Sequence, residues 1–217
     1  ADTRVHRWTR GDWQLLPLMR QARRYGIDAL GLWKMADNLR RSLVMPASWA
    51  LLVWVLFTGA LHLGAALAVV GAALLAGPLM GAAAGLVPTR RGIAWRHFFY
   101  VGARDLARSA ITAAYQFSQL ALQAALFAHA VAVTLGRLRS GHGLLEWTTA
   151  AQAQASAWDG PTAFVRGHAR MVAACVLGAG ASLAGPHPLA GFTLFALWAL
   201  APLIAWRASR VPQADTA

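Results

Sequence analysis

The chain has 217 residues, of which 58% are hydrophobic and 13% are charged, with a mean hydropathy of +0.45. Soluble domains contain about 25% charged residues, so this composition indicates a membrane protein. The net charge of +12 would suit a nucleic-acid partner, but the basic residues flank apolar runs instead of alternating with exposed aromatic residues, which argues against that class. The single cysteine, Cys175, excludes a disulfide framework and a cysteine-based metal site.

Charged side chains are absent from three long runs, at 42–89, 109–136 and 171–206. A membrane-crossing helix needs about 20 apolar residues, so the first run predicts two crossings with a tight turn at Gly64. The third run predicts two shorter crossings, because Gly185 and Pro186 mark a turn at its middle. The sequence thus predicts an all-α membrane protein with two transmembrane helical hairpins, at 44–87 and 171–206, plus amphipathic interfacial helices.

The middle run, 109–136, fits either a fifth crossing or a helix at the membrane interface. Its amides fall on one stripe of a helix, which suits an interfacial helix or a channel wall, and the candidate channel-lining residues are Gln116, Gln119 and Gln123. With five crossings, the basic residues from Arg137 onward would lie on the opposite side of the membrane from the other basic residues. With four crossings, all 20 basic residues lie on one side. The positive-inside rule favours four, with the basic loops in the cytoplasm.

The remaining segments are expected to connect these parts. Residues 88–170 form a cytoplasmic or interfacial helical connection, with a capping box at Thr149 and Gln152, and residues 207–217 begin a linker. Two features of the apolar runs point to packing or function. The spacing of Gly77, Gly81 and Gly85 predicts close approach by a neighbouring helix, and His129 is an ionisable group in an apolar run.

Residues 1–43 carry the side chains with the clearest chemistry. RVHRW, from Arg4 to Trp8, is followed by RGDWQ, from Arg10 to Gln14. An indole beside a guanidinium can stack on a sugar ring while the arginine binds hydroxyl or phosphate oxygens, although a basic aromatic belt at the membrane surface has the same composition. Asp12 is interpreted as a partner of neighbouring arginines that fixes the indoles, and Asp37 is interpreted as a partner of Arg40 and Arg41.

RVHRW has the form of the Q/R-x-x-R-W signature of processive membrane-embedded glycosyltransferases such as cellulose and hyaluronan synthases, with Arg4 where glutamine is more usual. Three later stretches extend the resemblance: LWKMADNLRRSLVMPA from Leu32, LLEWTTAAQAQ from Leu144 and LWALAPLIAWRAS from Leu197. In order and spacing, these stretches resemble the middle of cyclic β-1,2-glucan synthases over essentially the whole chain.

The resemblance implies a hexosyltransferase that polymerises glucose from UDP-glucose into cyclic β-1,2-glucan and exports it across the bacterial inner membrane. It implies a divalent metal, Mg or Mn, held by upstream Asp residues, a glycosyltransferase domain whose end is 1–43, and a glycoside-phosphorylase-like domain after residue 217. Within the chain, Arg7 and Trp8 resemble the pair that holds the acceptor end of the glucan. The residues expected to bind the acceptor are Arg4, Arg7, Trp8, Arg10, Asp12, Trp13 and Gln14.

No catalytic or metal-binding residue is expected in this stretch, so the chain alone is expected to be inactive. Because it opens with ADTRVHRW, without an initiating methionine or the apolar core of a signal peptide, we expect a section of a longer protein. The alternative function is a non-enzymatic transporter or membrane anchor, in which the tryptophans and arginines set depth and the amide stripe lines a substrate path.

Overall fold

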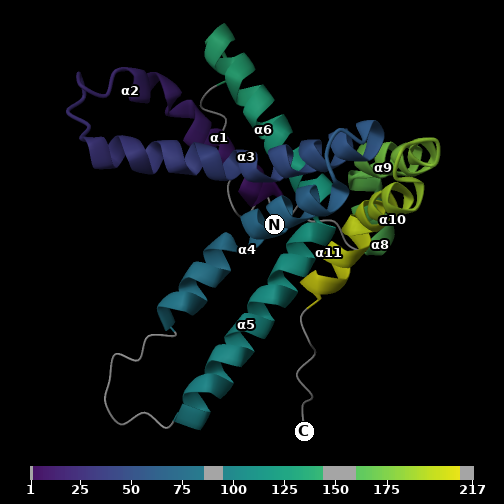
Figure 1. Ribbon diagram of the computed structural model, residues 1–217. Coiled ribbons are helices and arrows are strands. Elements are labelled where there is room, and N and C mark those ends of the chain that lie inside the picture. Colours follow the sequence, from purple (N-terminus) through teal and green to yellow (C-terminus); the bar gives the residue numbers. More distant parts are fainter. Residues whose placement is uncertain (1, 86–94, 144–159, 211–217) are drawn as a thin grey trace, which may run out of the picture.

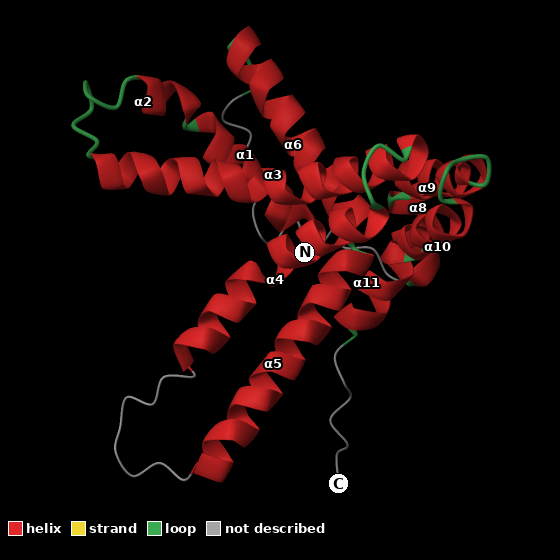
Figure 2. Cartoon of the chain, viewed as in Figure 1, coloured by secondary structure: helices red, strands yellow, loops and turns green. Residues whose placement is uncertain are grey.

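A computed structural model describes residues 2–85, 95–143 and 160–210. Within these ranges the chain forms helices joined by short loops, with no strand (Figure 2), so the expected all-α class is confirmed. The predicted capping box at Thr149 and Gln152 lies outside the described residues. In chain order the helices are α1 (Asp2–Gln14), α2 (Leu16–Arg20), α3 (Ala29–Thr58), α4 (Leu63–Gly85), α5 (Trp95–Ser118), α6 (Leu120–Ser140), α8 (Pro161–Gly167), α9 (Ala169–Ser182), α10 (Pro188–Ala199) and α11 (Ala201–Ser209).

Helix α3 joins the polar N-terminal part of the chain to the first apolar run without interruption. It begins after Asp28, whose carboxylate accepts a hydrogen bond of 2.7 Å from the backbone N–H of Gly31 and so satisfies a donor at the helix start. It ends at Gly59, which adopts the left-handed conformation with a φ of 62°. Helix α3 is thus continuous across the boundary predicted between residues 43 and 44, and the predicted first crossing corresponds to the apolar half of this longer helix.

The turn of the first hairpin lies at residues 59–62, and Gly64, which the sequence analysis placed in that turn, is in the first turn of α4. The left-handed Gly59 ends α3 four residues before α4 begins, which explains the shift. Among the described residues, no atom lies within 4 Å of where a Cβ would stand on Gly77 or Gly81. Within this part of the chain the predicted glycine groove therefore has no neighbouring helix.

Two helices in the described ranges are long and apolar enough to cross a membrane, α3 and α6. Helices α10 and α11, which bend by 41° relative to each other, form a third candidate span if they are taken together. Shorter apolar helices cover Leu63–Pro78 and Ala169–Ser182. Several large apolar side chains face outward, including Leu177 at 73% and Leu189 at 81% exposure, as expected for surfaces that contact lipid.

The middle apolar run is divided into two helices. Helix α5 ends at Ser118, α6 begins at Leu120, and the two diverge at this point (Figure 1). Helix α6 qualifies as a candidate span, whereas the sequence analysis placed the whole run at the interface. Helix α6 is thus compatible with a crossing as well as with an interfacial position, and the number of crossings stays a prediction.

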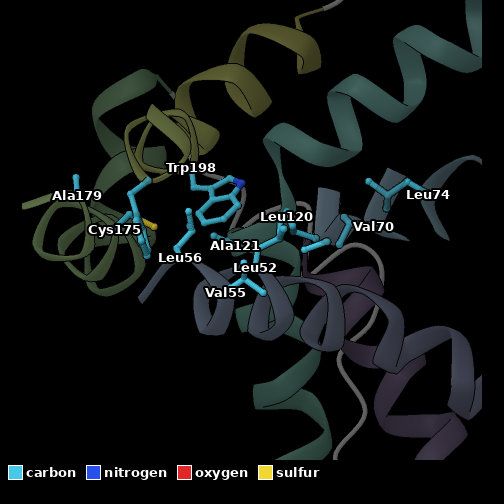
Figure 3. Close-up of a cluster of buried hydrophobic side chains, with 12 residues drawn as sticks. Leu52, Val55, Leu56, Val70, Leu74, Leu120, Ala121, Cys175, Ala179 and Trp198 are labelled. Carbon is cyan, nitrogen blue, oxygen red and sulfur yellow. The ribbon is translucent and has the colours of Figure 1, made fainter. Parts of the chain in front are cut away.

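The core lies where α3, α4, α6, α9 and α10 converge. Figure 3 shows side chains from these helices pointing into one cluster, with Trp198 of α10 beside Leu56 of α3. Trp198 is fully buried, and its indole N–H donates a hydrogen bond of 3.2 Å to the backbone carbonyl of Phe117 in the last turn of α5. That carbonyl is one of those that a helix end leaves without an intrahelical partner, so the bond fixes α10 at the break between α5 and α6.

Helix α6 crosses α3 at a steep angle (Figure 1). Leu120 and Ala121, at the start of α6, share the core cluster with Leu52 near the end of α3, whereas Phe127, farther along α6, meets Ser42 in the polar half of α3. Beyond this crossing α6 also contacts α1, where His129 lies beside His6.

Candidate functional site

Helix α1, which carries RVHRW and RGDWQ, is fixed to the two longest candidate spans. The indole N–H of Trp13 donates a hydrogen bond of 2.8 Å to the hydroxyl of Ser42 on α3. Two turns earlier on the same face of α1, His6 Nε2 lies 2.9 Å from His129 Nδ1 on α6. These two contacts hold the motif helix in a defined orientation at the junction of α3 and α6.

A pocket of about 240 Å³ opens at this junction. Trp8 and Asp12 of α1 form one wall, and the opposite side is formed by residues of α3 and by one side chain of α6. The complete lining is Val5, Trp8, Thr9, Asp12, Asn38, Arg41, Ser42 and Phe127. Two aromatic rings and several hydrogen-bonding groups thus surround a small open space, which is a suitable lining for a polar ring such as a sugar.

The indole of Trp8 is the most exposed part of this lining that can stack on a ligand. It is 62% exposed, and the guanidinium carbon of Arg4 lies 5.3 Å from its ring centroid, within the range of a cation–π contact. Arg4 therefore positions the indole and brings five N–H donors beside it. This is the juxtaposition of stacking surface and oxygen-binding group that RVHRW indicated.

The polar side of the pocket is organised by hydrogen bonds and ion pairs. Burial raises the pKa of Asp12, and a hydrogen bond with Asn38 opposes that rise. Arg41 forms an ion pair of 2.6 Å with Asp37, which also pairs with Arg40 at 2.8 Å. The predicted pairing of Asp37 with both arginines is confirmed, and it holds Arg41 at the edge of the pocket.

The helical geometry of α1 separates the predicted acceptor-binding residues. Successive residues project about 100° apart on an α-helix, so Arg7 and Trp8 cannot point the same way. Of the predicted set, Trp8 and Asp12 line the pocket and Arg4 contacts Trp8. Trp13 fixes α1 to α3, and Arg7, Arg10 and Gln14 are not in the lining.

The sequence analysis missed the part of the lining that comes from other helices. Asn38, Arg41 and Ser42 are spaced so that they share one face of α3, and that spacing was a signal that could have found them. Phe127 could not be found in this way, because only the packing of α6 brings it to α1.

The candidate channel-lining amides do not form a continuous stripe. Gln119 lies at the break between α5 and α6 and is only 2% exposed, while its amide donates a hydrogen bond of 3.2 Å to Ser118. Gln116 is in α5 and Gln123 is in α6, and both are half-buried. Their role in a substrate path stays a prediction.

The ligand types that bind metals do not gather in the described ranges. No group of three or more His, Cys, Asp and Glu side chains there could hold a metal ion. His6 and His129 form a pair without a third ligand. The described residues thus do not fit a resident divalent metal.

The fold and the site define an all-α protein with two to three candidate membrane spans and a small pocket, lined by aromatic and polar side chains, beside them. No family model matches the chain. A curated protein does match: the chain is 31% identical over 219 residues to the cyclic β-(1,2)-glucan synthase NdvB of Rhizobium meliloti (strain 1021). The match covers 98% of this chain and 8% of that protein. The chain is therefore a distant homologue of a segment of a cyclic β-1,2-glucan synthase.

Proposed function

We propose that the chain is the membrane and acceptor-binding section of a glucosyltransferase that polymerises glucose from UDP-glucose into cyclic β-1,2-glucan and exports it. The pocket beside Trp8 is the observation that carries this proposal. It lies within the motif on which the resemblance rests, and homology to a glucan synthase extends over nearly the whole chain. The protein would reside in the bacterial inner membrane with its basic segments in the cytoplasm.

In this proposal the pocket binds the acceptor end of the growing glucan. The Trp8 indole stacks on the apolar face of a glucosyl ring, and Arg4 keeps the indole in place while binding ring hydroxyls. Asp12 accepts hydrogen bonds from hydroxyls, Asn38 can donate and accept them, and Arg41 donates them. These groups bind and orient the acceptor.

The chemical step is assigned to parts of the full protein outside this chain. UDP-glucose and a divalent metal, Mg or Mn, would bind to the upstream domain, where the metal would neutralise charge on the leaving diphosphate. The described residues offer no cluster of metal ligands, so no step is assigned to a metal here. What this section would add is a fixed acceptor at the membrane surface.

The test is Trp8→Ala in the full-length protein, with Trp33→Ala as the matched control. Trp33 is also exposed, at 67%, and lies in α3 outside the pocket. Covering a large apolar side chain is worth about 1.5–3 kcal/mol, so Trp8→Ala should lower glucan synthesis from UDP-glucose by about tenfold or more at equal membrane levels. Trp33→Ala should leave it near the wild-type rate.

The same pair of variants distinguishes the alternative function. If the chain is a non-enzymatic anchor or transporter whose tryptophans only set depth, the two substitutions should act alike on membrane insertion and neither should act on synthesis. Wild-type synthesis by Trp8→Ala would overturn the acceptor assignment.

A further inference from the structure

A second and larger cavity lies on the other side of α6 from the acceptor pocket. Its volume is about 870 Å³, which is within the range of about 300–1,000 Å³ that small-molecule sites occupy. It is bounded by α3, by α6, by the end of α8 and by the first half of α9. Because α3 and α6 are both candidate spans, this cavity lies between two helices that are long and apolar enough to cross a membrane.

Most of the cavity wall is apolar. Trp49 of α3, Leu126 of α6 and Met171 of α9 are among the side chains that line it, together with several alanines. Its floor reaches the core, because Cys175 and Ala121 belong both to the lining and to the buried cluster (Figure 3). A wall of this kind is suited to a hydrocarbon chain.

One part of the wall is cationic. Arg166, in the last turn of α8, and Arg170, in the first turn of α9, both line the cavity and are exposed. Within the described residues neither arginine has an ion-pair partner, and no Asp or Glu is among the described residues of the lining. Among the residues that the structure describes, the positive charge of this part of the wall has no acidic partner, and it complements an anionic group.

The cationic and the apolar parts of the wall lie at different positions along α9. Ala179, farther along α9, lies in the core cluster with Leu56, in the apolar half of α3. Arg170 is at the opposite end of α9, so the cationic part of the cavity lies toward the polar half of α3. An amphiphile in the cavity would have its headgroup at the surface and its chain in the apolar part.

We propose that this cavity binds an anionic phospholipid, with the phosphate at Arg166 and Arg170 and an acyl chain between α3, α6 and α9. Arginine suits the phosphate because its planar fork matches phosphate oxygens. Basic pockets between transmembrane helices bind anionic headgroups by the same chemistry. The bound lipid would fill the space between two candidate spans and join α8 and α9 to the α3–α6 pair. The proposal goes beyond acceptor binding and does not depend on it.

The test is lipid retention by the intact protein, reconstituted in bilayers of equal amounts of phosphatidylglycerol and phosphatidylcholine, extracted into detergent and examined by native mass spectrometry. We expect retention of phosphatidylglycerol in preference to phosphatidylcholine. The double variant Arg166→Gln/Arg170→Gln should lower that preference by about tenfold, the scale expected for one to two charge contacts. Arg139→Gln is the matched control, since Arg139 is exposed near the end of α6 and does not line the cavity.

A second pair of variants tests whether the cavity binds the acyl chain of the lipid. Ala174→Phe should fill the cavity and abolish retention of either lipid, whereas Ala173→Phe, at the adjacent exposed position outside the lining, should not. Glycerol phosphate, which has the anionic group without a chain, should not displace the lipid. Equal retention of the two lipids, equal behaviour of the arginine double variant and Arg139→Gln, or full displacement by glycerol phosphate would each overturn the proposal.

Discussion

His6 on α1 and His129 on α6 are joined by a hydrogen bond of 2.9 Å between His6 Nε2 and His129 Nδ1, with their ring centroids 5.1 Å apart. One nitrogen must donate and the other must accept, so the bond exists only while at least one ring is neutral. The bond links the helix that carries RVHRW to a candidate span. Docking of α1 on α6 should therefore respond to pH.

The direction follows from the pKa of His6. Burial lowers that pKa from 6.5, and the nearby positive charges of His129, Arg10 and Arg137 lower it further. Docked α1 thus binds fewer protons than undocked α1, so docking is strengthened as the pH rises and is lost as the pH falls below 6.5. Docking of α1 on α6 should be measured between about pH 5 and pH 8, the range in which histidines change charge.

The measurement is the distance between spin labels on α1 and α6. Labels at Gly11→Cys and Ala132→Cys, in a Cys175→Ala background, use two exposed positions. The distance distribution should broaden as the pH is lowered, and the added substitution His6→Gln should remove most of that change. An unchanged distribution across the window would contradict the prediction.

The hydrogen bond between Trp13 and Ser42 should be measurable by a double-mutant cycle. Ser42 is 4% exposed, and its hydroxyl donates a bond of 2.7 Å to the backbone carbonyl of Leu39 while accepting the indole N–H. We expect a coupling free energy of about 1 kcal/mol between Trp13→Phe and Ser42→Ala, the net value of a typical hydrogen bond. Unfolding in mixed micelles with increasing SDS gives the four stabilities, and strictly additive effects would show that the bond contributes nothing.

The hairpin of α9 and α10 depends on two glycines at its interface. A Cβ on Gly178 would lie 2.5 Å from the ring of Phe195, and a Cβ on Gly191 would lie 2.5 Å from Ser182 Cβ. Gly178→Ala and Gly191→Ala should each destabilise the protein by about 1–3 kcal/mol through overpacking. Gly180→Ala is the control, because no atom lies within 4 Å of that position and alanine favours a helix by about 1 kcal/mol over glycine. Equal stability of the three variants would mean that the helices are not this close.

These glycines illustrate which parts of the fold could be predicted from the sequence and which could not. The charge-free runs, the turn at Gly185 and Pro186, and the pairing of Asp37 with Arg40 and Arg41 are local features, and the structure contains each of them. Which glycines face another helix depends on how the helices are rotated against each other. The regular spacing of Gly77 and Gly81 predicts a close approach, whereas Gly178 of α9 is the position where an added Cβ would lie against the ring of Phe195.

In the candidate site, too, the local motif could be predicted from the sequence, whereas the contacts between helices could not. RVHRW identified Trp8 and Arg4, which the structure brings into contact. It could not show that Asp12 shares a pocket with Asn38, because that depends on the packing of α1 against α3. Nor could the charge pattern reveal the break at Gln119 that separates α5 from α6, since residues on both sides of it are equally apolar.

The packing of α6 predicts the side of the membrane on which its last turn lies. Because α6 contacts α1 at its midpoint through His129, and Arg137 in its last turn lies near His6, we expect Ser140 to lie on the same side as α1. Membrane-impermeant maleimide should therefore label Ser140→Cys and Gly11→Cys from one side of the membrane. It should label Ala60→Cys, in the turn after α3, from the other.

This labelling result would also show on which side of the membrane Arg137 and Arg139 lie. With Ser140 on the side of α1, Arg137 and Arg139 join the basic residues of the N-terminal part, as the four-crossing topology and the positive-inside rule require. Five crossings would place Ser140 with Ala60 instead. Labelling of Ser140→Cys and Ala60→Cys from the same side would contradict the predicted four-crossing topology.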